Sequence, residues 1–554
     1  MTSLSPRSLD RYDRLLALAL AVVYVALLLA TAGSLGYARD EGFYFHAART
    51  YGGWFDLLWM DSSQALKRFN TDRYFSVNHE HPALIKSLFA LSHELFYEKL
   101  GWFSEQGTAY RFPGMLTAGT ALATLYAWGA QTLGRLPGLI AALLFAAMPR
   151  MFYHAHLACF DMPVAAMWLV TAYAYFRSLY SDKLGWAIAT GILYGLLLDT
   201  KHNAWLLPPA LVLHLAITRG PELVAQVRKR QVPAIPKGLV AMAVLGPIVF
   251  FAGWPWIWHD TIPRLVEYVR FHTGHEYYNM EFLGRTYWKP PMPLLYAWVM
   301  TLATVPTITL VLFACGLVSS AFAVRGRTQS EGGRLRFSTD VLWALGLLTS
   351  YAPWLSDTTP IFGGTKHWIT AYPFLCLFAA RGFAVAAQRC AALFPRLRTE
   401  LTTTGLALAV LAAPLVMTAH SHPWGLSFYT PLVGGVPGAA NLGLNRTFWG
   451  YTTDALLGFI NQRAARNAGV YVHDTALQSF DMLELDGRAR RDLRPTLAIH
   501  QSQLALYHHE AHMRRVEYQI WIDYGTAAPA ALGVYDGVPI VWVYERRRRS
   551  VAGR

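Results

Sequence analysis

Charged residues are scarce in this chain: they make up 15% of its 554 residues, whereas 54% are hydrophobic. A typical soluble domain carries about 25% charged residues. The composition therefore argues against an ordinary soluble enzyme and predicts a polytopic α-helical membrane protein. Cysteine is also scarce. The chain has four, Cys159, Cys315, Cys376 and Cys390, and no CxxC spacing, so neither a disulfide framework nor a cysteine zinc site is indicated.

Long apolar segments recur along the chain. The first, 15–35, follows three arginines and is longer than the core of a cleaved signal peptide, so we expect an uncleaved first membrane helix. Spans need about 20 residues, and the shorter segments must extend into their flanks. We predict about eleven spans. The other ten segments are 112–133, 136–148, 163–180, 184–198, 204–217, 239–258, 293–322, 341–354, 368–385 and 404–417.

Basic residues gather in alternate loops. With the N-terminus in the cytoplasm, this is the positive-inside pattern of a multi-pass protein of the plasma (inner) membrane. The net charge of +14 then reflects loops that face an anionic leaflet, and no nucleic acid partner is expected. The inside loops carry Arg135; Arg177 and Lys183; Arg219, Arg228, Lys229, Arg230 and Lys237; Arg325, Arg327, Arg334 and Arg336; and Arg389, Arg396 and Arg398.

The opposite loops are then extracytoplasmic. The first, 36–111, is long and contains "HPALIKSLFALSHELFYEKLG", in which leucines at helical spacing predict an amphipathic helix on the outer surface. We predict a transmembrane module over 1–420 and a small extracytoplasmic α/β domain over 421–554. In that domain we expect strands at "GVYVHDT", "YQIWIDYG" and "VPIVWVYE", and helices at "DALLGFINQRAARN" and "SQLALYHHEAHMRRV".

Three acids stand close to membrane ends on the outer side. Asp40 and Glu41 follow the first apolar segment, and Asp161 precedes Pro163, where a helix is expected to begin. Two interpretations stay open. The acids are solvated loop residues or helix caps, or they act on a substrate at the membrane surface.

Two Lys-His pairs also stand on the outer side, Lys201-His202 and Lys366-His367. Each lysine is either a snorkelling side chain or a cation for a lipid phosphate. Two lysines at matching depth, on the side that disfavours cations, favour phosphate binding.

A divalent metal, zinc or another, is a further hypothesis. "NHEHP" places Glu80 between two histidines, and imidazole and carboxylate suit zinc. The loop 259–292 adds His259, His272 and His275, any of which can complete a metal or substrate site. The alternative is a polar loop that precedes a helix.

The order of the motifs resembles the GT-C glycosyltransferases, in the bacterial branch near the protein O-mannosyltransferases and the lipid A aminoarabinose transferases (families 39 and 83). The resemblance covers about 39–462. Its motifs are "RDEGFYFHAAR", "HEHPALIK", "RFPGMLTAGTALATLYAWG", "GRLPGLIAALLFAAMPRMFYHAHLACFDMP", "GILYGLLLDTKHNAW", "KHWITAYPFLCLFAARG", "FYTPLVGG" and "WGYTTDALLGFINQ".

The resemblance implies transfer of a sugar from a polyprenyl-phosphate donor to an acceptor on the non-cytoplasmic face, mostly with inversion of the anomeric centre. It makes Asp40 the catalytic base, with Glu41 beside it. Asp161 matches a second acid. Lys201 matches a lysine near the donor phosphate, and Lys366-His367 a later basic pair.

The resemblance also implies a metal role for Glu80 with a histidine of a later loop, for which we name His259. One departure is His81-Pro82-Ala83, where the aminoarabinose transferases typically carry a lysine before two prolines. The acceptor is a protein, a lipid or a wall polymer, and the sequence does not say which. The alternative functions are a lipid-linked sugar flippase or transporter and an assembly scaffold. The near absence of Asp, Glu and Lys from the predicted spans disfavours a transport path.

Overall fold

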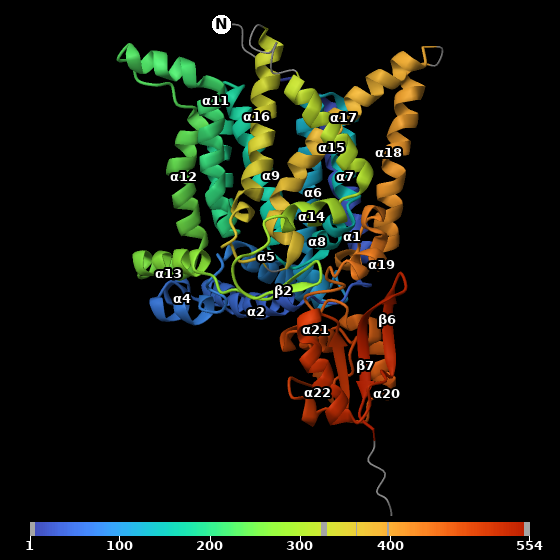
Figure 1. Cartoon of the computed structure of the whole chain (residues 1–554). Coiled ribbons are helices and arrows are strands. Elements are labelled where there is room, and N and C mark those ends of the chain that lie inside the picture. Colours follow the sequence, from blue (N-terminus) through green and yellow to red (C-terminus); the bar gives the residue numbers. More distant parts are fainter. Residues whose placement is uncertain (1–5, 323–329, 362, 396–397, 548–554) are drawn as a thin grey trace, which may run out of the picture.

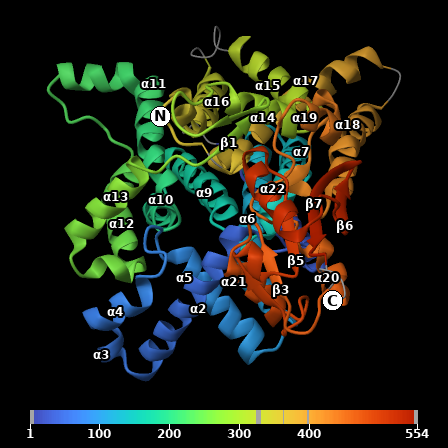
Figure 2. The ribbon, with the colours of Figure 1, turned by 60° about the horizontal axis from the view of Figure 1, so that its bottom comes forward.

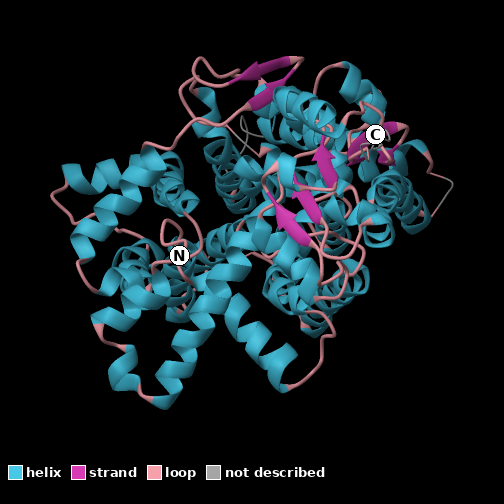
Figure 3. Ribbon diagram, turned by 90° about the horizontal axis from the view of Figure 1, so that it is seen from below, coloured by secondary structure: helices cyan, strands magenta, loops and turns pink. Residues whose placement is uncertain are grey.

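The computed structural model describes residues 6–322, 330–361, 363–395 and 398–547. Long helices run side by side in a bundle, and α2 (Arg39–Met60), α4 (Arg68–Phe75) and α13 (Thr261–Thr273) lie across one end of it (Figure 1). A small sheet from the C-terminal part of the chain lies beyond the same end (Figures 1 and 3). The fold is therefore mostly helical with a small C-terminal sheet, as the sequence predicts at this level. Arg325, Arg327 and Arg396 lie outside the described residues.

Each predicted apolar segment overlaps a helix of the bundle, but the bounds agree unevenly. Segment 184–198 coincides with α10, whereas α11 ends well beyond 217, α16 begins well before 341, and α8 forms between two predicted segments. The helices are α1 (Arg11–Ala32), α6 (Gln106–Thr132), α7 (Arg135–Ala146), α8 (Pro149–His156), α9 (Asp161–Leu179), α10 (Leu184–Leu198), α11 (Leu207–Arg228), α12 (Lys237–Gly253), α14 (Tyr296–Thr304), α15 (Thr307–Phe322), α16 (Glu331–Tyr351), α17 (Tyr372–Leu393) and α18 (Thr399–Ser421).

One predicted segment, 293–322, is not a single straight helix. It bends by 118° between α14 and α15, with Pro306 at the break. By length and apolar composition, three helices of the described chain are suited to cross a membrane, or up to five if each bent pair counts as one span. The predicted number of about eleven spans is not confirmed by this measure and stays a prediction.

Apolar side chains on the outside of the bundle suit a lipid environment. α1 exposes Leu18, Val22 and Val23, and α18 exposes Leu408 and Val416. Exposed apolar faces of this length mark contact with a membrane or a partner surface. Since both helices are also long and apolar enough to cross a membrane, we interpret the faces as lipid-facing.

Small residues bring α15 and α17 into close contact. A Cβ atom on Gly316 would overlap the carbonyl oxygen of Phe378, and one on Gly382 would overlap that of Leu312. Close backbone approach at small residues is typical of helix packing in membranes. This packing fixes α17, and with it the short helix η6 (Gly364–Ala371) that precedes it.

The segment 36–111, predicted as the first extracytoplasmic loop, is more helical than the sequence predicts. Asp40 and Glu41 are not loop residues, because they occupy the first turn of the 22-residue helix α2. Further helices in this region are α3 (Ser62–Ala65), α5 (Leu84–Ser92) and the π-helix η1 (His93–Lys99). The last two cover the predicted amphipathic helix.

Five strands form the C-terminal sheet, in the order β4-β3-β5-β7-β6. β3 pairs parallel with β4 and β5, whereas β7 pairs antiparallel with β5 and β6. The strands are β3 (Gly469–Val472), β4 (Arg494–Thr496), β5 (Leu504–His508), β6 (Ala531–Tyr535) and β7 (Val538–Glu545); the helices of this part are α19 (Gly435–Asn441), α20 (Leu457–Arg463), α21 (Leu477–Leu485) and α22 (Arg514–Tyr524). The division of the chain into domains at 420 stays a prediction.

Two segments of this part were assigned wrongly from the sequence. "YQIWIDYG" lies in helix α22, whose buried residues Ile520 and Tyr524 are one turn apart and which ends at Gly525 with φ 67°. "SQLALYHHEAHMRRV" is not one helix, because Leu504–His508 forms strand β5. All five residues of β5 are buried between β3 and β7, and this burial on both faces hides the alternation of an ordinary strand.

Candidate active site

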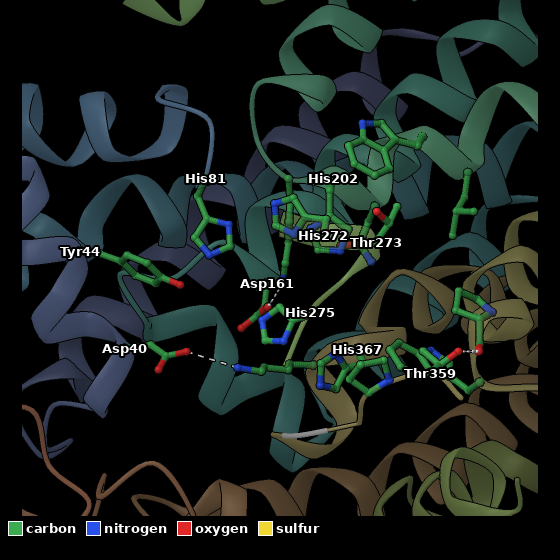
Figure 4. A pocket seen from close by; sticks show the side chains of 18 residues that line it. Asp40, Tyr44, His81, Asp161, His202, His272, Thr273, His275, Thr359 and His367 are labelled. Atoms are coloured by element: carbon green, nitrogen blue, oxygen red, sulfur yellow. Dashed lines mark hydrogen bonds and ion pairs between the residues drawn. The ribbon is translucent and has the colours of Figure 1, made fainter. Parts of the chain in front are cut away.

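One cavity of about 340 Å³ gathers nine of the residues named in the sequence analysis: Asp40, His81, Asp161, Lys201, His202, His272, His275, Lys366 and His367. It lies where the first turns of α2 and α9 meet the segment before η2 (His202–Leu206) and the helix η6. Figure 4 shows Asp40, Asp161 and His367 converging from elements far apart in the chain. Helices α2 and α13, which contribute Asp40 and His272 to the cavity, lie at the same end of the bundle (Figures 1 and 2).

Helix starts place the two acids. Asp40 lies in the first turn of α2, and Asp161 is the first residue of α9. A carboxylate is stabilised at a helix N-terminus by the helix dipole and by amide groups that have no partner within the helix. Both acids therefore line the cavity from the first turns of their helices.

Each acid is paired with a lysine of the cavity. The Nζ atom of Lys201 lies 2.7 Å from Oδ1 of Asp161, and Nζ of Lys366 lies 3.2 Å from Oδ2 of Asp40 (Figure 4). Asp161 is 5% exposed and Asp40 is 20% exposed. Asp40 is thus the more accessible of the two carboxylates.

Three histidines line the wall beside Lys201. The rings of His202 and His272 stack with centroids 4.0 Å apart, and His81 lies 5.5 Å from His272. Burial lowers the pKa of His272 to about 4 and lowers the pKa of His81 and of His202 well below the usual value. These imidazoles are therefore neutral at pH 7 and offer hydrogen bonds rather than charge.

Part of the cavity wall was missed in the sequence. Tyr44, Trp205 and Trp354 line it, and Trp354 packs on His367 with ring centroids 4.8 Å apart. Tyr44 follows Asp40 by one helical turn, a signal that is visible only if Arg39–Met60 is assigned as helix. His272 and His275 were among the histidines of the loop 259–292, but their positions in the sequence do not distinguish them from His259.

Glu41 does not reach the cavity. Its carboxylate is fully buried and accepts hydrogen bonds from Arg111 at 2.7 and 2.8 Å and from the backbone amides of Ala38 and Ala158, both at 2.9 Å. Every contact is structural, so Glu41 ties the start of α2 to α6 and to the loop before α9. It shapes the site without touching the cavity.

The residues named for a metal are not brought together. Glu80 accepts a hydrogen bond from Asn78 at 2.6 Å, and its backbone carbonyl accepts one from His272 at 2.9 Å. Neither Glu80 nor His259 lines the cavity. Within the described part of the chain no group of three or more His, Cys, Asp or Glu side chains could hold a metal ion. The arrangement does not fit the metal site that the resemblance implies, and the metal stays a prediction.

Comparison with known proteins finds similarity to a family model and to solved structures. Residues 80–251 match the model of a family described as dolichyl-phosphate-mannose-protein mannosyltransferase. No curated protein matches the chain. Among solved structures, ArnT from Cupriavidus metallidurans bound to undecaprenyl phosphate is 15% identical, with a TM-score of 0.47 over 98% of this chain and 99% of that one.

The oligosaccharyltransferase AglB from Archaeoglobus fulgidus, in complex with an inhibitory peptide and a dolichol-phosphate, is 10% identical, with a TM-score of 0.47 over 92% of this chain and 71% of that one. The family match contains seven residues that line the cavity, among them Asp161 and Lys201. Over residues 80–251 it confirms the resemblance to the protein O-mannosyltransferases that the motifs indicate.

Proposed function

We propose that this protein is a membrane glycosyltransferase that moves a sugar from a polyprenyl-phosphate donor to a hydroxyl group of an acceptor, which is a protein, a lipid or a wall polymer. The observation that carries the proposal is the pair of Asp-Lys contacts, Asp40 with Lys366 and Asp161 with Lys201, in one cavity at the end of the bundle. The proposal includes the orientation predicted from the loops, with the cavity and the C-terminal sheet on the extracytoplasmic side.

Asp40 is the general base of this proposal. A hydroxyl group is a weak nucleophile until a base takes its proton in the transition state. Asp40 is the more accessible carboxylate of the cavity, and its partner Lys366 holds it toward the interior. As the acceptor oxygen bonds to the anomeric carbon, the proton passes to Asp40.

The two lysines stabilise the leaving group. The bond between the anomeric carbon and the phosphate oxygen breaks, and its electron pair stays on the polyprenyl phosphate. Lys201 and Lys366 are the cations that meet this charge, and cations held in a partly buried site act more strongly than in water. Asp161 fixes Lys201 by the 2.7 Å contact. His367 lines the same wall as a further donor.

The membrane supplies the rest of the site. A polyprenyl chain held in the bilayer delivers its phosphate at the membrane surface, where we place the cavity, which reduces the freedom lost on binding. The aromatic side chains Tyr44, Trp205 and Trp354 provide flat apolar faces for a sugar ring. The identity of the sugar is not part of the proposal.

The test is release of the lipid product. The purified protein is supplied with undecaprenyl-phosphate-linked mannose or arabinose and an extract of envelope lipids and proteins, and free undecaprenyl phosphate is measured. Asp40→Asn should lower the rate about 100-fold or more. Asp56→Asn is the matched control, because Asp56 lies exposed on the same helix, outside the cavity.

Each outcome decides something. An unchanged rate in Asp40→Asn would remove Asp40 as the base. Movement of the lipid-linked sugar across vesicles without release of undecaprenyl phosphate would favour the alternative, a flippase or transporter. Deletion of the gene followed by mass spectrometry of cell lipids and proteins would then identify the acceptor by its lost sugar.

A further inference from the structure

The C-terminal part of the chain contacts the first turn of α2, which carries Asp40. The backbone amide of Arg39 donates to the carbonyl of Trp449 at 2.7 Å, and the hydroxyl of Ser479 donates to the carbonyl of Ala38 at 2.9 Å. A Cβ atom on Gly42 would overlap Ser479, so the two surfaces touch without space for a side chain. The C-terminal part is thus in direct contact with the wall of the proposed active site.

Arg39 links Asp40 to this C-terminal part. One guanidinium nitrogen, Nη1, lies 2.7 Å from Oδ1 of Asp474, and another, Nε, lies 3.8 Å from Oδ1 of Asp40. Asp474 is 2% exposed, so it holds Arg39 by a buried contact. The shorter distance to Asp474 means that this acid, rather than Asp40, is the main partner of Arg39.

A second acid lies beside Asp474. Glu510 is buried, and burial together with the charge of Asp474 raises the pKa of Glu510 well above its usual value. Burial thus disfavours a second negative charge beside the contact between Asp474 and Arg39. The pair Arg39-Asp474 is then close to neutral as seen from Asp40.

Trp449 holds the other member of the cavity pair. Nζ of Lys366 lies 4.1 Å from the centre of the Trp449 ring, as well as 3.2 Å from Oδ2 of Asp40. An ammonium group over an indole face is attracted by the electrons of the ring. Unlike a second carboxylate, the ring adds no negative charge that would oppose a phosphate.

The backbone of Trp449 has a rare conformation, which indicates that the position of its side chain is fixed by the surrounding contacts. Its φ is 69°, in the left-handed region that bulky residues rarely adopt, and Gly450 follows with φ 58°. Such conformations persist where surrounding contacts fix them, and they gather at functional sites. Here they place the indole ring against the ammonium group of Lys366.

We propose that Trp449 and Asp474 are positioning residues, through which the C-terminal part of the chain completes the active site: Trp449 fixes Lys366, and Asp474 fixes Arg39 beside Asp40. This inference rests on the proposed glycosyl transfer. It gives the C-terminal part a role in catalysis, that of holding Lys366 and Arg39 in place. Neither residue touches the substrate.

The two residues act on different kinetic constants. Without the indole face, Lys366 loses its contact with the ring and meets the donor phosphate less often, so Trp449→Leu should raise KM for the undecaprenyl-phosphate sugar about tenfold. Without the charge of Asp474, Arg39 is free to pair with Asp40 and favours its ionised form. Asp474→Asn should then lower kcat about tenfold and shift the acid limb of the pH profile to lower pH.

Conservative variants separate positioning from folding. Trp449→Phe keeps a ring face and should retain KM within about threefold. Asp474→Glu keeps the charge and should restore the pH profile. Glu545→Gln is the matched control, since Glu545 also forms a 2.7 Å ion pair in the C-terminal sheet, with the exposed Arg463, and lies outside the cavity. Thermal melting of each variant checks that it is folded.

A binding measurement makes the test independent of turnover. The affinity for undecaprenyl phosphate is measured for the wild type, Trp449→Leu and Trp449→Phe by thermophoresis in detergent. Weaker binding by the leucine variant alone is the expected result. If the folded Trp449→Leu and Asp474→Asn variants match the wild type in KM, kcat, pH profile and binding, the inference is overturned. Absence of turnover with intact, Trp449-dependent binding would instead contradict the proposed function and leave the placement of Lys366 supported.

Discussion

Lys201 and Asp161, 40 positions apart in the chain, meet inside the cavity with Nζ and Oδ1 2.7 Å apart. Both are largely buried, at 13% and 5% exposure of their side chains. Removing two charges from water can cost more free energy than their mutual attraction returns, so a buried ion pair is weak evidence for a purely stabilising role. The pair is thus evidence for a site that binds a charged ligand, since an incoming phosphate can share Lys201 without leaving a buried cation uncompensated.

Lys201→Met should abolish most of the activity. The variant removes one of two cations that stabilise the leaving phosphate, and we expect kcat/KM for an undecaprenyl-phosphate sugar to fall about 100-fold. Lys183→Met is the matched control, because Lys183 is exposed beside the opposite end of α10. Equal activity of the two variants would show that Lys201 does not meet the phosphate.

Glu41→Gln should destabilise the fold rather than impair chemistry alone. Arg111, 1% exposed, would keep its charge in the interior with no carboxylate beside it. Loss of one partner of a buried pair costs about 3–5 kcal/mol of unfolding free energy. Thermal melting in detergent should show a large loss for Glu41→Gln and almost none for Asp40→Asn, whose carboxylate is partly exposed. Similar melting of the two variants would contradict the structural role.

Lys86 should make stability depend on pH. The side chain is fully buried, and its ammonium group donates to the carbonyls of Asn78 and His81. Burial lowers the pKa of Lys86 to about 7, from 10.5 in a solvated lysine. Between these values the unfolded chain binds more protons, so the stability it contributes rises with pH and is lost as pH falls through 7.

The measurement is the melting temperature at pH 7 and pH 9. The wild type should gain stability over this range, and Lys86→Met should gain less. Lys99→Met is the control, because Lys99 is exposed and lies one helix later, at the end of η1. If the Lys86→Met and wild-type curves run parallel, the lysine titrates as it does in water.

From the sequence, the positions of helices and of the charged residues in the cavity were predictable, whereas the uncharged side chains that line the cavity were not. Segment 184–198 coincides with α10 because the polar residues Lys183 and Asp199 mark both ends of its apolar run. Asp161 and Lys201 were predictable because they stand at the ends of such helices. The stacking of His272 on His202 depends on how α13 folds back across the bundle, which local sequence does not encode.

The same reason explains the errors in the C-terminal part. β5 lies in the middle of a sheet whose order, β4-β3-β5-β7-β6, follows from pairing between distant strands. Its sequence, "LALYH", has no alternation because both faces are buried. Likewise Trp449 opens one of the motifs of the resemblance, but its contact with Lys366 was not predictable, since Lys366 comes from an earlier and separate part of the chain.

Two glycines of α2 test the contact between this helix and the C-terminal part. A Cβ atom at Gly42 would overlap the backbone and hydroxyl of Ser479, whereas one at Gly52, in the same helix, meets nothing within 4 Å. Gly52→Ala should stabilise the protein by about 0.5–1 kcal/mol, because alanine is the better helix former. Gly42→Ala gains the same helix propensity, but it should lower the melting temperature and the activity together, because it separates α2 from the segment that holds Asp474 and Trp449.

Limited proteolysis gives a direct readout, since a displaced C-terminal part should be cleaved sooner in Gly42→Ala than in Gly52→Ala. Equal protection of both variants would mean that the two surfaces do not touch as closely as the structure has them.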